Sequence, residues 1–189
     1  MTRTWRRRRS HDASDRATRN SARGVRLQMN PLGELLGVDD IRLDLDARDK
    51  AELLEVLAVM LSHRVGLPRA DVLDSLVARE QLGSTGLSHG VAIPHARIAQ
   101  CSVAAGVFVR TGAPISFDAP DGRPVSLFIG LVVPKAANER HLKLLATAAE
   151  MFSDRTFRER LRTCRERADA QDLLSAWPNP PGAGPGDSR

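Results

Sequence analysis

The sequence lacks the residues that several common protein classes depend on. It has no tyrosine and an aromatic content of 4%, so it offers few side chains on which single-stranded nucleic acid could stack. Its two cysteines, Cys101 and Cys164, are too few and too far apart for a disulfide framework or a zinc site, and we expect reduced thiols in a cytoplasmic protein. The longest apolar runs, such as residues 125–133, are much shorter than the roughly 18 residues of a membrane span, so we expect no membrane insertion.

Nucleotide and metal fingerprints are also missing. The sequence contains no GxxxxGK followed by Ser or Thr, no GxGxxG after an apolar run, and no HExxH. These patterns supply phosphate-cradling backbone and zinc ligands in the classes that use them. We therefore expect no nucleotide cofactor and no metal.

The excess of positive charge is confined to the N-terminus. The net charge is +5, yet residues 1–28 alone hold nine arginines and two aspartates, and the other residues hold 19 basic and 21 acidic side chains. We expect residues 1–28 to be a disordered basic tail. They either precede a true start at Met29 or form an arm for an acidic partner. The body, with its slightly negative charge, is not expected to bind nucleic acid, although the tail could do so in a strongly salt-dependent way.

Hydrophobic periodicity predicts one folded domain over residues 29–177, followed by a disordered Pro- and Gly-rich tail at 178–189. Strands are predicted at 41–45, 91–93, 103–109, 115–117 and 125–133. Helices are predicted around 53–61, 72–77, 138–152, 154–164 and 169–176, with Asp46 capping the first and Gly66 ending it. Helices, then strands, then helices indicate an α/β (mixed α+β) domain, in which a mixed sheet of about five strands has helices on both faces.

The stretch 79–97 carries the residues suited to phosphoryl chemistry. Its glycine-rich loop can gather backbone N–H groups into an anion-binding nest, and Arg79 adds a charged fork. His95 follows a short apolar run, and a neutral imidazole there could accept a phosphoryl group covalently. The residues alone leave open which ring nitrogen would react. The expected phosphoryl-binding loop consists of Gly83, Ser84, Thr85 and Gly86, whose two hydroxyls would add donors.

This stretch resembles the active-site region of the enzyme IIA domains of the bacterial phosphoenolpyruvate-dependent phosphotransferase system. The similarity is to the fructose/mannitol type, and most closely to its nitrogen-regulatory member. The matching patterns are RE at 79–80, GSTG at 83–86, and G-aliphatic-AIPH at 90–95. An FDA-x-D-x-x-PV segment at 117–125 and an LVVP…HL-x-x-L segment at 131–145 extend the resemblance. Together these segments make the resemblance cover nearly all of the expected folded body.

The resemblance implies a phosphotransferase-system component with a phosphohistidine intermediate. His95 would accept the phosphoryl group, on Nε2, from a phosphorylated HPr-like carrier. His141 would lie beside it and contact the phosphoryl oxygens or steady the ring, while Arg79 would offset the phosphoryl charge. The protein would regulate partners, of unknown identity, according to its phosphorylation state. Arg97 would have only a minor steering role, and His89, where the family usually has Asn, is expected to be a tolerated loop residue.

Several alternatives stay open. The chain could be the soluble IIA component of a fructose/mannitol-type sugar uptake system. In a different class, His89, His95 and His141 could together hold zinc in a hydrolase, although no carboxylate base accompanies them. A weak homodimer is also left open.

Overall fold

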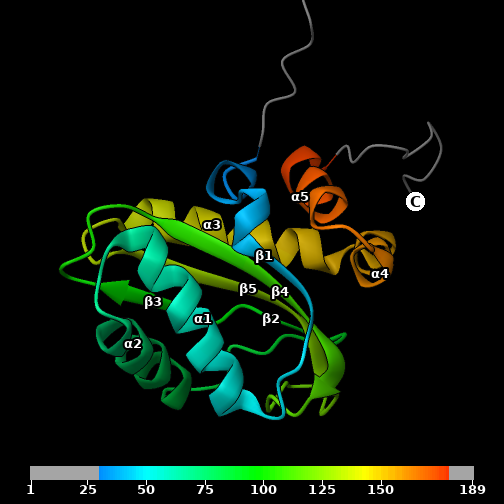
Figure 1. Cartoon of the computed structure of the whole chain (residues 1–189), viewed down its shortest axis with the longest axis horizontal. Helices are drawn as coiled ribbons and strands as arrows, with labels where there is room; N and C mark the ends of the chain where they lie inside the picture. Colours follow the sequence, from blue (N-terminus) through cyan, green and yellow to red (C-terminus); the bar gives the residue numbers. More distant parts are fainter. Residues whose placement is uncertain (1–29, 179–189) are drawn as a thin grey trace, which may run out of the picture.

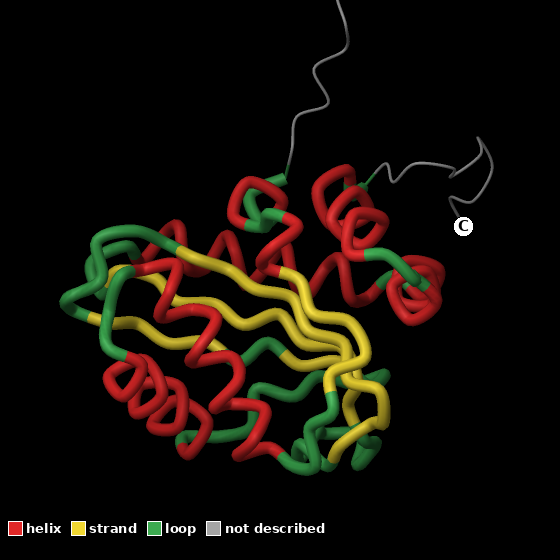
Figure 2. The backbone as a smooth tube through the Cα atoms, viewed as in Figure 1, coloured by secondary structure: helices red, strands yellow, loops and turns green. Residues whose placement is uncertain are grey.

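A five-stranded mixed sheet runs through the middle of the protein, between two layers of helices, in the computed structural model (Figure 1; Figure 2). The structure describes residues 30–178. The predicted basic tail at 1–28, with the alternative start at Met29, lies outside the described residues, as does 179–189 of the predicted C-terminal tail.

The order of the strands places two short strands in line along one edge. The strands are β1 (Ile41–Leu45), β2 (Val91–Ala92), β3 (His95–Ile98), β4 (Ala105–Ile115) and β5 (Val125–Pro134). The order is β1-β4-β5-β2, and β3 also pairs with β5. β4 and β5 are antiparallel, β1 is parallel to β4, and β2 and β3 are both parallel to β5. β2 and β3 therefore follow one another along β5, with a break between them at residues 93–94.

Two helices cover one face of the sheet and three cover the other. In the view of Figure 1, α1 (Lys50–Val65) and α2 (Arg69–Gln81) lie in front of the sheet. The helix α3 (Asn138–Ser153) lies behind it, on the side that also carries α4 (Arg155–Thr163) and α5 (Arg167–Ala176). Two single 3-10 turns, η1 (Gly33–Leu35) and η2 (Val38–Asp40), precede β1. The predicted class, a mixed sheet of about five strands with helices on both faces, is confirmed.

The local predictions fail at three points. Asp49, not Asp46, caps α1: its side chain accepts from the Glu52 amide at 2.9 Å. The helix cannot begin earlier because Ala47 is buried in the core in a non-helical segment. Residues 115–117 are not a separate strand, since β4 runs on to Ile115. The strand β3 was not predicted, because its four residues alternate too briefly to stand out and are ordered by pairing with β5.

The central strand β5 divides the core into two. Phe128 and Val132 pack with residues of α1 and α2, whereas Leu127, Ile129 and Leu131 pack with α3, α4 and α5. Gly130 lies between Ile129 and Leu131 on this strand. A Cβ added to it would lie 3.0 Å from a Val107 methyl and 3.1 Å from a Leu57 methyl. The small residue therefore lets α1 approach the sheet closely.

Arg110 of β4 joins elements that are distant in the sequence. Its Nη1 donates to the carbonyls of Leu161, Arg162 and Cys164 at 2.6–3.1 Å, and so caps the end of α4. Its Nε and Nη2 donate to one Asp44 oxygen at 3.1 and 2.8 Å. The guanidinium is buried, whereas the Asp44 side chain is 68% exposed. The carbonyl oxygens at the end of α4 therefore need Arg110 as a hydrogen-bond donor, whereas the exposed Asp44 carboxylate can bind water instead.

We predict that Arg110→Met lowers the free energy of unfolding by about 2–3 kcal/mol, because the terminal carbonyls of α4 lose a charged donor. The control, Asp44→Asn, should cost less than about 1 kcal/mol, since the exposed carboxylate contributes little and the Asn side-chain oxygen can still accept from Arg110. Urea unfolding followed by circular dichroism measures both. Equal losses in the two variants would contradict this assignment.

Candidate functional site

Arg79, His95 and His141 come together at the edge formed by β3. His95 is the first residue of β3, Arg79 lies in the last turn of α2, and His141 lies in the first turn of α3. The Nε of Arg79 donates to Nε2 of His95 at 3.1 Å. The ring centroids of His95 and His141 are 5.2 Å apart, with an interplanar angle of 51°. The fold thus gathers three predicted residues from three separate elements.

The break between β2 and β3 determines the tautomer of His95. The Nδ1 of His95 lies 2.7 Å from the carbonyl oxygen of Ile93. A carbonyl oxygen only accepts, so Nδ1 carries the hydrogen in the neutral ring. Nε2 therefore holds the lone pair, in agreement with its acceptance of the Arg79 hydrogen bond.

Burial keeps both imidazoles neutral. Burial is the main cause that lowers the pKa of His95 from its ordinary value of 6.5. Repulsion by Arg79, and by His141 when that ring is protonated, lowers it further. The Ile93 bond acts in the opposite direction, but the net shift is downward. Burial also lowers the pKa of His141, followed by the charges of Arg97 and Arg79. Both rings are therefore uncharged at neutral pH, beside two guanidinium groups.

His141 keeps hydrogen-bonding capacity at one ring nitrogen. Its side chain is buried, and its Nδ1 has no hydrogen-bond partner within residues 30–178. Arg97 helps to place it, since Nη2 of Arg97 donates to the carbonyl of Lys135 and to Oδ1 of Asn138, the first residue of α3. Arg97 thereby ties β3 to the start of the helix that carries His141.

The loop 83–86 is held by a buried carboxylate. Glu80, of which 9% is exposed, accepts through Oε2 from the amide and the hydroxyl of Thr85, at 3.0 and 2.6 Å. Its Oε1 accepts from Lys50 Nζ at 2.8 Å. No role was predicted for Glu80 from the sequence. The signal that could have found it is a charged residue on the buried face of α2, next to Arg79.

The two loop hydroxyls make hydrogen bonds within the protein. Ser84 Oγ donates to the Phe117 carbonyl at 2.6 Å and accepts from the Gly86 amide at 3.0 Å. The Thr85 hydroxyl is bound to Glu80, as described above, so in this structure neither hydroxyl is a free donor. Gly83 contributes through its carbonyl, which accepts from Arg79 Nη1 at 2.9 Å. The loop thus fixes the orientation of the Arg79 guanidinium group.

His89 lies outside this group of side chains. It is exposed, with a φ of +70°. Asn and His both tolerate this left-handed region better than most residues do, which explains how His89 can stand where the family usually has Asn. Its backbone binds Asp121 and Arg162, away from His95. Within residues 30–178 no three His, Cys, Asp or Glu side chains are grouped as metal ligands, so the alternative of a three-histidine zinc site has no support in the described part of the chain.

Residues 86–90 read Gly-Leu-Ser-His-Gly, a pattern also found at the nucleophile of serine hydrolases. In those enzymes the serine follows a strand and begins a helix. Here the segment follows α2 and leads into β2, which is the reverse order. The context therefore argues against a nucleophilic role for Ser88.

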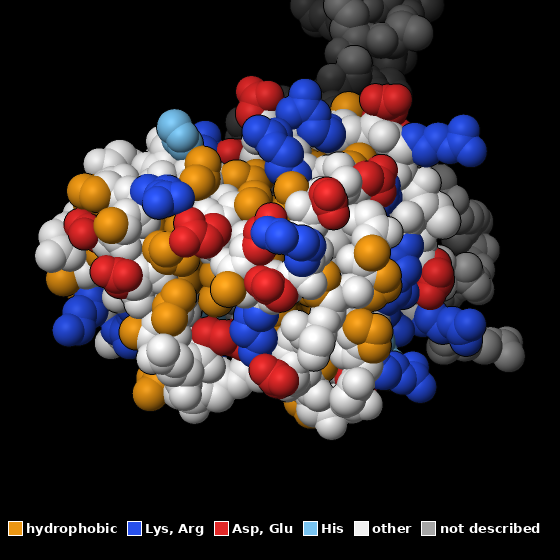
Figure 3. All heavy atoms as spheres, turned by 60° about the horizontal axis from the view of Figure 1, so that its bottom comes forward, with side chains coloured by type: hydrophobic (Ala, Val, Ile, Leu, Met, Phe, Trp, Pro, Cys, Tyr) orange, Lys and Arg blue, Asp and Glu red, His pale blue; other side chains and the backbone are white. Residues whose placement is uncertain are grey.

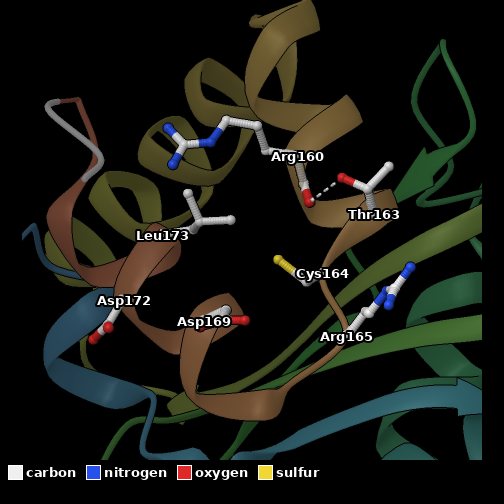
Figure 4. A pocket seen from close by; sticks show the side chains of 7 residues that line it. All are labelled: Arg160, Thr163, Cys164, Arg165, Asp169, Asp172 and Leu173. Atoms are coloured by element: carbon white, nitrogen blue, oxygen red, sulfur yellow. Dashed lines mark hydrogen bonds between the residues drawn. The ribbon is translucent and has the colours of Figure 1, made fainter. Parts of the chain in front are cut away.

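A cavity of about 410 Å³ around Cys164 also lies apart from His95 (Figure 4). Burial and the charge of Asp169 raise the pKa of the Cys164 thiol, which makes it a poor nucleophile at neutral pH.

No helix among residues 30–178 has both the length and the apolar character needed to cross a bilayer.

The tautomer of His95 can be tested in solution. We predict that long-range ¹H–¹⁵N spectra show His95 with its hydrogen on Nδ1, and that the ring titrates below 6.5 because burial disfavours the charged form. The same chain in urea supplies the reference titration. A hydrogen on Nε2, or a pKa above that of the unfolded chain, would contradict the geometry.

Known proteins match both the sequence and the fold. Residues 34–177 match the family described as phosphoenolpyruvate-dependent sugar phosphotransferase system, EIIA 2. The nitrogen regulatory protein of Pseudomonas aeruginosa is 43% identical over 117 residues, covering 60% of this chain and 75% of that protein. That of Klebsiella oxytoca is 32% identical over 145 residues, covering 76% and 90%.

The crystal structure of the nitrogen regulatory protein IIA-Ntr from Neisseria meningitidis has the same fold. Its TM-score is 0.74 at 44% identity, and the match covers 76% of this chain and 98% of that one. The match to the family spans most of the chain and includes all three elements that carry Arg79, His95 and His141. The chain belongs to the EIIA 2 family of the phosphoenolpyruvate-dependent phosphotransferase system.

Proposed function

We propose that this protein accepts a phosphoryl group on His95 from a phosphorylated HPr-like carrier and regulates partner proteins by its phosphorylation state. One observation carries the proposal: His95 is neutral and donates through Nδ1 to a backbone carbonyl, so that its Nε2 lone pair faces Arg79. We place this activity in the cytoplasm, and assign it to a domain that spans residues 29–177.

The proposed reaction is a transfer between two histidines. The Nε2 lone pair of His95 attacks the phosphorus, a new N–P bond forms, and the N–P bond of the carrier's phosphohistidine breaks. The electron pair of that bond returns to the carrier's nitrogen. The Nδ1 hydrogen of His95 stays in its bond to Ile93, so that no base is needed to remove a proton from the acceptor.

Arg79 and His141 would stabilise the charge on the transferred group. Phosphoryl transfer depends mainly on positioning and on stabilisation of the three equatorial oxygens. The Arg79 Nε–H now occupies the Nε2 lone pair, and a small shift of the guanidinium would move it to a phosphoryl oxygen. The ring of His141 lies close to that of His95, with the ring centroids 5.2 Å apart, and would contact a phosphoryl oxygen or steady the acceptor ring.

Exposed leucines beside these residues suit a protein donor. Leu82, three residues after Arg79, is 86% exposed, and Leu142, next to His141, is 65% exposed. Large apolar side chains in such positions commonly mark surfaces that bind other proteins. We infer that the carrier docks here, with its phosphohistidine directed at His95.

The regulatory role rests on the relatives. The proteins of Pseudomonas aeruginosa and Neisseria meningitidis, both more than 40% identical to this chain, are named nitrogen regulatory proteins. We therefore favour regulation over sugar uptake for this chain, with its targets still to be identified.

Phosphorylation by phosphoenolpyruvate, enzyme I and an HPr-type carrier tests the acceptor. Intact mass should show one added phosphoryl group on the wild type and none on His95→Ala, because the nucleophile is gone. The control, His141→Ala, should still take one phosphoryl group but more slowly, by about tenfold or more, since it loses only a stabilising contact. Phosphate on folded His95→Ala would overturn the assignment.

Phosphorylation by a small donor distinguishes a defect in docking of the carrier from a defect in the transfer step at His95. We predict that Leu142→Ser slows phosphorylation by the carrier about tenfold, because an apolar contact with the carrier is lost. Phosphorylation of the same variant by phosphoramidate should keep the wild-type rate. The matched control is Val59→Ser on the opposite layer of helices, where the side chain is also exposed. Equal rates for Leu142→Ser and wild type with the carrier would remove Leu142 from the docking surface.

A further inference from the structure

A groove rich in arginine lies at the far end of β5 from His95. Its volume is about 570 Å³. Ser126, near the start of β5, lines it, whereas His95 pairs with Leu131 of the same strand. Five residues of strand span roughly 17 Å, so the groove is distinct from the phosphoryl-acceptor site. It is lined by His89, Gly90, Pro114, Arg123, Pro124, Ser126, Arg155, Arg158, Glu159 and Arg162.

Positive charge dominates this groove. Four arginines line it, and Glu159 is its only carboxylate within the described residues. Arg162 pairs with Glu159 at 3.0 Å and donates to the His89 carbonyl at 2.6 Å. The side chains of Arg123 and Arg155 are exposed and make no hydrogen bond or ion pair with residues 30–178. Figure 3 shows Lys and Arg side chains gathered along the side of the molecule on which Figure 1 places α4.

Arg158 adds a buried charged side chain to the exposed arginines of the groove. It is only 6% exposed, and its Nη1 donates to the carbonyls of Phe152 and Ser153 at 2.6 and 2.8 Å. Its Nε is buried and has no partner within the described residues. Burial, followed by the charge of Arg162, lowers the pKa of Arg158, while the carboxylates of Asp154 and Glu159 act in the opposite direction. A buried guanidinium with an N–H group unused is costly, and an additional anion would reduce that cost.

We propose that this groove binds a small molecule that carries phosphate groups with at least two negative charges. Guanidinium forks suit phosphate oxygens because two parallel N–H groups can donate to one group. The volume lies in the range of small-molecule sites. Pro114 and Pro124 provide apolar wall for an organic part of the ligand. Neither the comparisons nor the proposed phosphoryl relay assigns a ligand to these residues.

Calorimetric titration of the full chain with pyrophosphate, ADP and inorganic phosphate tests the site. We expect saturable binding of pyrophosphate and ADP. The double variant Arg123→Gln/Arg155→Gln should weaken it by about tenfold or more, because two charged donors are lost. Arg48→Gln/Arg69→Gln is the matched control, since it removes two exposed arginines, one just before α1 and one at the start of α2, neither of which lines the groove. It should bind as the wild type does.

Amide spectra locate the ligand. Addition of pyrophosphate should shift the amides of Gly90 and Ser126 in the wild type. Absence of saturable binding at millimolar concentration, equal weakening in the two double variants, or shifts that leave Gly90 and Ser126 unchanged would each overturn the proposal. Phosphorylation at His95 is expected to be normal in both double variants, because neither changes a residue near that ring.

Discussion

The hydrogen bond from Nδ1 of His95 to the Ile93 carbonyl is the interaction on which the candidate site depends. It exists because the chain leaves β2 at Ala92 and rejoins the edge of β5 at His95, so that the carbonyl of Ile93 turns toward the ring. It assigns the ring hydrogen to Nδ1 and leaves the lone pair on Nε2. Only in that tautomer is the nitrogen that faces Arg79 a nucleophile. The closeness of His141 and the lowered pKa of the ring assist phosphoryl transfer only if this lone pair is present.

A second constraint holds the surroundings of the ring in place. The carboxylate of Glu80 is buried, and a buried charge is stable only when its oxygens are satisfied. Lys50 from the start of α1 and two donors of Thr85 provide this. α1, α2 and the glycine-rich loop therefore meet at one side chain, and the neighbouring residue on α2 is Arg79. Rigid support of this kind preorganises the charge that faces the acceptor.

Much of this arrangement could be predicted from the sequence, and the rest depends on contacts that the sequence does not mark. The motif at 79–95 placed Arg79 and His95 together, and the resemblance added His141. Helical and strand periodicity gave the layers correctly. The sequence did not predict β3, because a four-residue edge strand is ordered by its partner. It also did not predict that Ser84 and Thr85 are occupied within the protein, since Phe117 and Glu80 reach them only through the fold.

The most direct test identifies the nitrogen that carries phosphorus. The protein labelled with ¹⁵N-histidine and phosphorylated by its carrier would give ¹H–¹⁵N and ³¹P spectra in which the modified ring nitrogen is distinguished from the protonated one. We predict phosphorus on Nε2 of His95, with Nδ1 still protonated and bound to Ile93. Phosphorus on Nδ1 would require that hydrogen bond to break, and it would show that Nε2 is not the nucleophile.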